Sequence, residues 1–517
     1  IDVRRADAAM IMFDVDNSTF TDLGYHGVYV AASSTAYVGN VMANLVDCTF
    51  TDLGGYSYYL SPGRPGATGD DQRVALTRVR AHNTTGVYIS LDGYALEDYY
   101  RLTMDKVNIT HTRGDAINVI IHPYQSARMD TVLRDVFTRV TNGTALTLSY
   151  TSDRNQPLWG HLTGERITLL DQQMGGLSLY EHTGSIEDLT IKGSVDYDMH
   201  KVDNQLPSDE TGILELHSAS MDRNKVKVVG DGSLWVFNSL SVKVEWQNGM
   251  AALGAGVQVQ DRSFEVVAVG HVEGEHGMDP VELLAYILDS SEFRSRSPFI
   301  VNITFLDLEQ TGVCSLDEPS TVLIIVHDRV APSVVILEPD DGASQRASYF
   351  ELRGSAFDAH AGLYQIRYNL DGDEWVDIGS ASPFRTTVTD VEPGKHTLEV
   401  EVEDRAGNVA REVISIDIDN QPPYLLVVSP EGDLLTRNPS LVIRGETEDG
   451  AAISINGEDV ETLHGLFIAE VDLQEGPNTV TVVSMDRLSN VATVRFIAVL
   501  DTVEPFLDIQ SHEDGDW

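Results

Sequence analysis

Short segments of alternating apolar and polar residues recur about every thirty positions in the N-terminal part of the chain. The string TFTDLG at residues 19–24 reappears unchanged at residues 49–54. Period-two alternation predicts strands, and the Gly, Asn and Asp residues between the segments predict turns, so helical repeats are excluded. The alternating pairs that keep this register are Val28/Val30, Tyr58/Leu60, Val87/Ile89, Ile117/Val119, Leu146/Leu148 and Leu177/Leu179.

A coil of strands that returns to the same corner every thirty residues stacks its strands in parallel, one rung about 4.8 Å above the last. Over residues 1–235 this pattern resembles the right-handed parallel β-helix (pectin-lyase-like) family. The strings that carry the resemblance are GVYV at 27–30, GVYI at 86–89 and GDAINV at 114–119. That family includes pectin-type lyases and hydrolases, phage tailspikes, adhesins and surface-layer components, so the resemblance implies the fold and leaves the function to the site.

A second repeat begins at Asp328 with the spacing D-x-x-x-P. The same spacing returns 91 residues later at Asp419, and again 82 residues after that at Asp501. Alternating segments such as TLEVEV at 397–402 and turns every 8–12 residues predict β-sandwiches of about 85 residues. The strings YNLDG (368–372), DRAGN (404–408) and ING (455–457) resemble bacterial and archaeal Ig-like surface repeats.

The expected fold class is therefore all-β, a right-handed parallel β-helix followed by tandem Ig-like β-sandwiches. A β-rich stretch between the two repeats, with Asn248-Gly249 in its first turn, resembles a transthyretin-like spacer module. The expected domains are a β-helix at 1–235, the spacer at 236–327, Ig-like sandwiches at 328–418 and 419–500, and the start of a further repeat at 501–517.

Charge and cysteine content narrow the function. The net charge of −45, from 35 Lys+Arg against 80 Asp+Glu, excludes a general nucleic-acid binder and a polybasic membrane-surface protein, since both need a positive field. Cys48 and Cys314 are far apart in sequence, which argues against a disulfide scaffold and a paired-cysteine metal site. No apolar run is long enough for a membrane span, so a membrane anchor is expected only in segments outside this sequence.

The longest interruptions of the β-helix, at 61–73, 91–101, 122–130 and 149–161, all follow the same strand and should stack on one side. They carry aromatic and polar side chains of the kind that stack on sugar rings and hydrogen-bond to hydroxyls. The alternative is that the rings only fill turns over the β-surface. The candidate ligand-binding residues are Arg64, Tyr94, Tyr99, Tyr100, Tyr124, Arg154, Trp159 and His161.

Catalysis on a β-helix needs carboxylates that converge on one groove, or a base together with a cation. Asp115 with His111 loosely resembles the Gly-Asp-Asp of pectin-type hydrolases, but the second Asp is Ala116 here and the family's other strings are absent. Asp115 and His111 are therefore expected to be turn residues. If the protein were an enzyme, Asp115, His111 and His122 would be its catalytic candidates, and two carboxylates about 5–10 Å apart across a groove would support that hypothesis.

Acidic and amide residues recur at the module junctions and could converge as oxygen ligands for Ca²⁺, the one cofactor that the sequence suggests. The alternative is that they cap turns through bonds to the backbone. The candidate metal ligands are Asp328, Asp358, Asp404, Asn408, Asp419, Asp449, Asp486, Asn490 and Asp501.

Candidate glycan acceptors, each in an N-x-S/T sequence, give weak support to an extracellular setting. They are Asn17, Asn83, Asn108, Asn142 and Asn302.

These features predict an extracellular, cell-surface structural or adhesive protein. A β-helix head would bind a cell-surface glycan or protein on a stalk of Ig-like modules, as an adhesin or as part of a surface layer or filament. Self-assembly through open β-helix ends or through the Ig-like modules is a further expectation, because an open β-edge invites strand addition. The alternative is a secreted polysaccharide lyase or glycoside hydrolase with accessory Ig-like modules.

Overall fold

The computed structural model describes residues 1–508 except 6–7, 33–36, 62–63, 66–70, 93–98, 124–126, 151–158, 205–211 and 276. The chain is all-β, as predicted. Across these described residues the one helical element is a single 3₁₀ turn, η1 (Arg223–Lys225). None of the described helical structure is long and apolar enough to cross a membrane. The chain forms two compact units, Ile1–Val326 and His327–Trp517.

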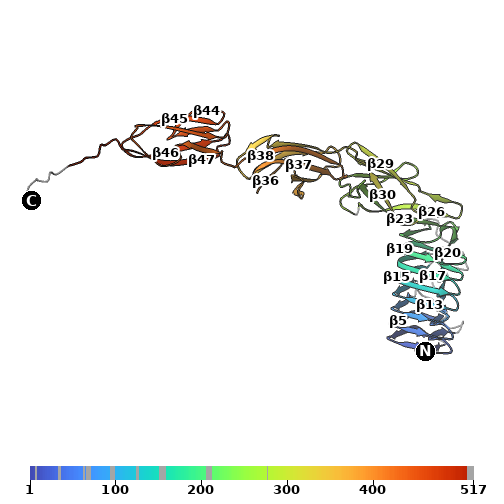
Figure 1. Cartoon of the computed structure of the whole chain (residues 1–517). Coiled ribbons are helices and arrows are strands. Elements are labelled where there is room, and N and C mark those ends of the chain that lie inside the picture. The colour runs from blue at the N-terminus through green and yellow to red at the C-terminus, as the bar shows by residue number, and fades with distance from the viewer. Residues whose placement is uncertain are drawn as a thin grey trace, which may run out of the picture. The chain divides into compact units, whose positions relative to one another are not determined.

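The first unit begins as a parallel β-solenoid, whose rungs are the stacked arrows from β5 to β20 in Figure 1. One wall is a nine-stranded sheet in which every neighbouring pair runs parallel, and its register joins Val28 to Tyr58, Tyr58 to Val87 and Val87 to Ile117, as the thirty-residue repeat predicts. Its strands are β1 (Asp2–Arg5), β4 (Val28–Ala32), β7 (Tyr58–Ser61), β11 (Val87–Asp92), β14 (Ile117–His122), β16 (Leu146–Tyr150), β18 (Gly175–Tyr180), β20 (Tyr197–Asp203) and β22 (Val226–Gly230).

The opposite wall belongs to a larger sheet whose rungs bend at residues with left-handed backbone. Asp47, Arg78, Asp135 and Arg166 hold φ between 50° and 53°, and ion pairs of 2.6 Å join Arg78 to Asp47 and Arg166 to Asp135 between successive rungs. The strands of this wall are β2 (Ala8–Asp16), β3 (Thr19–Thr21), β5 (Tyr37–Val46), β6 (Thr49–Thr51), β8 (Arg64–Pro65), β9 (Asp71–Thr77), β10 (Arg80–His82), β12 (Tyr99–Asp105), β13 (Asn108–Thr112), β15 (Arg128–Thr141), β17 (Trp159–Gln172), β19 (His182–Lys192) and β21 (Ile213–His217).

Aliphatic side chains fill the solenoid interior in columns that run from rung to rung. One column contains Val30, Leu60, Ile89, Val119, Leu148 and Leu179. The next rung places Lys201 in this column, where it pairs with Asp203, and both side chains are fully buried. Burial lowers the pKa of Lys201 to about 7, partly opposed by the charge of Glu181. The last rungs therefore replace apolar packing with a buried ion pair.

Both cysteines are free thiols. Cys48 is buried in the solenoid and Cys314 is half-buried. Burial raises the pKa of each thiol, as is typical of cysteines that act as small packing residues.

The strand β23 (Ser233–Trp246) connects the solenoid to the rest of the first unit. It pairs in parallel with β21 and with β30 (Ser320–Val326), and antiparallel with β26 (Met278–Asp289). The boundary expected at 235/236 therefore lies inside one continuous strand. The remaining strands here are β24 (Gly256–Gln260), β25 (Val266–His271), β27 (Phe293–Ser295), β28 (Phe299–Phe305) and β29 (Leu308–Cys314).

The second unit contains two Ig-like modules of two sheets each. In the first module a three-stranded sheet and a five-stranded sheet enclose a core that includes Phe350, Ile366 and Val400. Its strands are β31 (Ser333–Glu338), β33 (Phe350–Phe357) and β36 (Phe384–Val388), then β32 (Ala343–Gln345), β38 (Val409–Ile418), β37 (Gly394–Asp404), β34 (Leu363–Leu370) and β35 (Val376–Gly379).

The second module repeats this plan with a four-stranded and a five-stranded sheet around Ile443, Phe467 and Val480. Its strands are β39 (Leu425–Ser429), β41 (Ser440–Thr447), β45 (Leu466–Asp472) and β44 (Thr462–Leu463), then β40 (Leu434–Thr436), β47 (Val491–Leu500), β46 (Gly476–Met485), β42 (Ala452–Ile455) and β43 (Glu458–Val460).

Candidate metal centre

Three carboxylates of the first Ig-like module converge. Asp328 precedes β31, Asp358 follows β33 and Asp404 ends β37, yet one oxygen of each lies within 4.8 Å of the others. Asp328 and Asp404 are 1% and 0% exposed. The sequence analysis named all three among its candidate Ca²⁺ ligands from the recurrence of acidic residues at module junctions.

Backbone N–H groups fix all three carboxylates, including Asp404, which accepts from Ala406 and Asn408. Asp358 Oδ1 accepts from the backbone N–H of His360 at 3.0 Å and of Gly362 at 2.7 Å, and Asp328 Oδ1 accepts from that of Val330 at 2.9 Å. The capping role that the sequence offered as the alternative is therefore present. Capping does not account for every carboxylate oxygen, because Asp358 Oδ2 is buried and has no hydrogen-bond partner among the described residues.

Burial raises the pKa of Asp404, and the charge of Asp358 raises it further, against hydrogen bonds from Asn408 and Ala406 that lower it. Asn408 acts as a brace: its Nδ2 donates to Asp404 Oδ2 at 2.8 Å and to the carbonyl oxygen of Asp328 at 3.1 Å. The amide nitrogen of Asn408 thus holds two of the candidate ligands in place, and only its amide oxygen is left for a cation.

His360 belongs to this cluster and was missed by the sequence analysis. Its Nδ1 lies 3.3 Å from Asp328 Oδ1, and its side chain is 15% exposed. The signal that could have found it is its position two residues after Asp358, inside the turn that the carboxylate caps. A protonated imidazole here would offset part of the negative charge.

The donor set has the chemistry of a hard-cation site. Clustered carboxylates in a water-poor environment repel one another unless a positive charge lies among them. Ca²⁺ takes six to eight oxygen ligands from carboxylates, carbonyls and water, whereas structural zinc sites use Cys and His. Asp328, Asp358 and Asp404 fit Ca²⁺, and water or nearby carbonyl oxygens would complete its shell.

The corresponding residues of the second module do not close into such a cluster. Asn490 makes the same brace, with its Nδ2 2.8 Å from Asp486 Oδ2 and 2.8 Å from the carbonyl oxygen of Asp419. Asp449 is exposed, however, and Asp419 and Asp486 are half-buried. Within the described part of the chain, the group formed by Asp328, Asp358 and Asp404 is the one set of three metal-ligating side chains that meets this closely.

Instead, the carboxylates of the second module, together with Asp417 of β38 in the first module, line a cavity of about 310 Å³. Burial is the largest influence on Asp486 and raises its pKa, but the hydrogen bonds from Asn490 and Leu488 and the charge of Arg346 together lower it. The acidic residues that line this cavity are Asp417, Asp419, Glu448, Asp449 and Asp486.

The last metal candidate, Asp501, lies outside both clusters. It is exposed at the end of the second module, and its backbone N–H donates to the carbonyl oxygen of Thr436 at 3.0 Å.

The candidate ligand-binding residues of the solenoid loops are not brought together on the described surface. Tyr94, Tyr124 and Arg154 lie outside the described residues, and for Arg64 in β8 and Trp159 in β17 only the backbone is described. The described members of the set, Tyr99, Tyr100 and His161, lie in different environments.

Tyr100 is a core residue rather than a loop contact, because its side chain is 0% exposed and its ring lies 6.3 Å from that of Tyr150. The hydroxyl of Tyr99 donates to the Asp130 carboxylate on the next rung. His161 is exposed on β17. Tyr99 and His161 thus remain as surface residues on the larger sheet.

The candidate catalytic residues occupy separate places. His111 sits in a turn with φ 56° and packs its ring 4.8 Å from that of His82. Asp115 caps the next rung, where it accepts from the backbone N–H of Thr144 at 2.7 Å. His122 lies at the far end of β14, about 16 Å along the strand from its start. The turn roles expected for Asp115 and His111 are what the structure shows, and no catalytic convergence results.

The candidate glycan acceptors divide by exposure. Asn17, Asn108 and Asn142 are exposed. Asn83 and Asn302 are half-buried, and their amides donate to Asp52 Oδ1 at 2.7 Å and Gln260 Oε1 at 3.3 Å. The first three are thus the more accessible.

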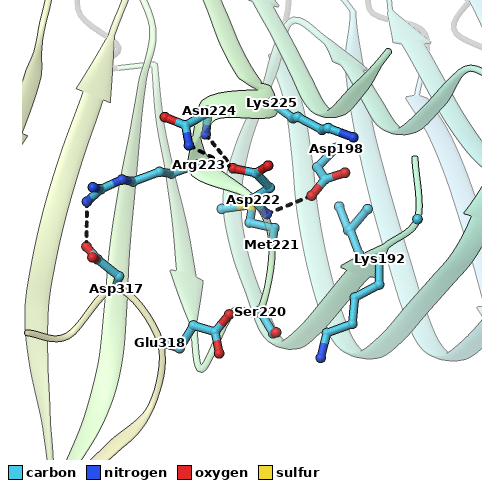
Figure 2. Close-up of a pocket in the computed structure, with 12 residues that line it drawn as sticks. Lys192, Asp198, Ser220, Met221, Asp222, Arg223, Asn224, Lys225, Asp317 and Glu318 are labelled. Carbon is cyan, nitrogen blue, oxygen red and sulfur yellow. Dashed lines mark hydrogen bonds and ion pairs between the residues drawn. The ribbon is translucent and has the colours of Figure 1, made fainter. Parts of the chain in front are cut away.

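A cavity of about 460 Å³ lies where the last solenoid turns meet the loop before β30 (Figure 2). Most of its charged groups bind one another: Arg223 donates to Asp317 at 2.7 Å, and Asp198 accepts from the backbone N–H of Asp222 at 2.7 Å. Lys192 is exposed and pairs with no described residue. The cavity is therefore mainly a junction held by ion pairs, and we assign it no ligand.

Comparison with known proteins identifies one region. Residues 332–400, within the first Ig-like module, match the family described as "Bacterial Ig domain". No curated protein matches the chain.

Similar solved structures include the fibronectin(III)-like modules of CbhA from Clostridium thermocellum, at 15% identity over 34% of this chain and 100% of that one, with a TM-score of 0.22. A bacterial ice-binding adhesin is 14% identical over 52% of this chain and 99% of that one, with a TM-score of 0.22. The tetra-tandem repeat of a large adhesion protein is 17% identical over 52% and 74%, with a TM-score of 0.17. At these scores the likenesses carry no argument about function, and what is shown is a parallel β-solenoid followed by a module similar to bacterial Ig domains.

Proposed function

We propose that this chain is an extracellular, cell-surface structural or adhesive protein in which Ca²⁺ stiffens the first Ig-like module. The observation that carries the proposal is the meeting of the Asp328, Asp358 and Asp404 carboxylates, two of them fully buried. A bacterial Ig-like module and an elongated repeat fold support the surface setting. A buried cluster of negative charge supports the cation.

The cation would join three segments of one module. Asp328 lies at the start of the module, Asp358 in the turn between β33 and β34, and Asp404 at the end of β37, where its Oδ1 also accepts from the backbone of Ala406 and Asn408. A ligand that binds the folded module and not the unfolded chain stabilises the fold by mass action. Ca²⁺ at this place therefore fixes where the chain enters the sandwich.

The alternative of a polysaccharide-degrading enzyme receives no support from the candidate residues. Asp115 is engaged in capping and His122 pairs with Asp92 at 3.4 Å, at the other end of the strand that follows Asp115. Acid–base catalysis needs both groups within reach of one bond.

Differential scanning calorimetry of the whole chain tests the cation. We expect millimolar CaCl₂ to raise the unfolding temperature of one transition relative to chelator, and Asp358→Asn to abolish the rise. Asp449→Asn, at the matching position of the second module, is the control and should keep it. A Ca²⁺ response that survives in Asp358→Asn would contradict the site. Antibody labelling of intact source cells tests the surface setting, which an intracellular signal would overturn.

A further inference from the structure

The outer face of the nine-stranded solenoid sheet is almost free of charge across its six central strands. The strands β4, β7, β11, β14, β16 and β18 contain one residue among Asp, Glu, Lys and Arg, which is Asp92, and it pairs with His122. The strands β9, β12, β15 and β17 of the opposite wall contain twelve. In a chain of net charge −45, this face is a neutral strip.

Tyrosine rings form a continuous stack at one end of this strip. Tyr29, Tyr59 and Tyr88 occupy the same position on successive rungs, with centroids 4.6 Å and 4.9 Å apart and ring planes within 14° of parallel. A second row, His26 and Tyr56, lies beside it, with His26 4.8 Å from the Tyr29 ring. We call these five residues the aromatic ladder, and all five are half-buried.

The same column continues with neutral polar side chains. Tyr88 aligns with Asn118, and Asn118 aligns with Thr147, both half-buried. A neighbouring column of the same face contains Ser90, Ile120 and Ser149. The face therefore offers hydroxyl and amide groups at the rung spacing of about 4.8 Å, next to a row of phenol hydroxyls.

We propose that this strip, with the aromatic ladder at one end, binds a neutral polysaccharide chain. The inference rests on the adhesive function proposed above and names the class of ligand for the solenoid. The proposed binding surface is the outer face of the sheet rather than the loops that interrupt the β-helix.

The chemistry of the strip matches an uncharged, hydroxyl-rich partner. Hydroxyl groups of Tyr, Ser and Thr both donate and accept, and the Asn amide does both, which is what a polyhydroxylated chain requires. The pKa values of Tyr56 and Tyr59 are raised, mainly by burial, so their phenols stay protonated. Acidic polymers are disfavoured because the whole chain is strongly negative.

Preorganisation adds to this match. The rings of the ladder are held by one another and by the rung register, so little side-chain freedom is lost when a ligand binds. Tyrosine supplies a large, rigid and amphipathic contact at low entropic cost, which is why it is common in binding surfaces. A protein partner fits less well because the columns that continue from the ladder contain Ser, Thr and Asn, whereas the buried core of a protein interface is more apolar.

Affinity electrophoresis of the whole chain tests the proposal. The probes are dextran, yeast mannan, hydroxyethyl cellulose and galactomannan as neutral polymers, with polygalacturonate and alginate as acidic ones, and a gelatin gel as the protein probe. We expect retardation by at least one neutral polymer, unchanged between 50 and 500 mM NaCl because no charges are involved. Chelator should leave it unchanged, which separates this result from that of the Ca²⁺ site.

Variants then locate the surface. Tyr59→Phe with Tyr88→Phe keeps both rings and removes two hydroxyls, so the affinity should fall about tenfold. Arg73→Gln, on an exposed position of the opposite wall, is the control and should change it less than twofold. Three results would each overturn the proposal. They are retardation by acidic polymers or gelatin alone, no retardation by any neutral polymer, and equal affinity in the double Phe variant.

Discussion

The two Ig-like modules contain the same junction residues, but only the first closes them into a buried cluster. Asp404 and Asp486 are equivalent, each braced by an Asn four residues later, yet Asp404 is fully buried and Asp486 is half-buried. Their pKa values move in opposite directions, up for Asp404 and down for Asp486. The repeated motif fixes the hairpin brace, and the surroundings decide whether the carboxylates close into a buried cluster.

A single turn accounts for much of this difference. In the first module Asp358 is followed two residues later by His360, whose ring approaches Asp328. In the second module Asp449 is followed by Gly450 and Ala451, and Asp449 stays exposed. The turn of the second module lacks a side chain that covers the acidic residues, so Asp449 is open to solvent.

Removing the brace acceptor should give the largest effect. In saturating Ca²⁺, Asp404→Ala removes the acceptor of one buried N–H, that of Ala406, and of two half-buried N–H bonds of Asn408, and it removes a ligand of the cation, so it should lower the local unfolding free energy by about 3 kcal/mol. Asp486→Ala should cost about 1 kcal/mol, because water reaches that site. Hydrogen exchange of peptides spanning 400–410 and 482–492 in the whole chain measures both, and equal losses would contradict the comparison.

The contributions of Asp404 and Asp486 to stability should depend on pH with opposite signs when Ca²⁺ is removed. A carboxyl group whose pKa is raised in the folded state holds its proton more tightly there, so the contribution of Asp404 should grow as the pH falls from 7 towards 4. Asp486 has a lowered pKa, so its contribution is lost as the pH falls below about 4. Hydrogen exchange corrected for intrinsic rates would show this, and the same sign in both modules would refute it.

Exchanging the turn residue should give the smallest effect. His360→Ala removes a side chain that competes with the cation for Asp328, so Ca²⁺ affinity should rise by about threefold or less. Ala451→His should leave Ca²⁺ binding unchanged, since Asp449 remains exposed. Titration of both variants with Ca²⁺ provides the check, and a loss of affinity in His360→Ala would instead make the imidazole a ligand.

Much of the fold follows from the sequence because both repeats are periodic. The thirty-residue register predicts the rungs, and the D-x-x-x-P spacing predicts two sandwiches. The convergence of Asp328, Asp358 and Asp404 was one of two roles that the sequence offered for the recurring acidic residues, the other being the capping of turns. Exposure could not be predicted, because an alternating strand shows which face a residue occupies but not what covers it, as Asp449 demonstrates. Tyr100 was misplaced for the same reason.

The aromatic ladder was available in the sequence and was overlooked. Tyr29, Tyr59 and Tyr88 recur at the same thirty-residue spacing as the apolar pairs that were used to find the rungs. In a parallel stack, residues that share a register position lie on top of one another, so their rings had to meet. Residues that recur in an outward column of a repeat therefore predict a stack on the surface, as those in an inward column predict the core.

The central claim is that one Ca²⁺ site exists and that it lies in the first module. Isothermal titration calorimetry of the whole chain, the Asp358→Asn variant and the Asp449→Asn variant tests it most directly. We predict one tight site in the original chain, none in Asp358→Asn and one in Asp449→Asn. Undiminished binding in Asp358→Asn, or loss of the site in Asp449→Asn, would contradict the account.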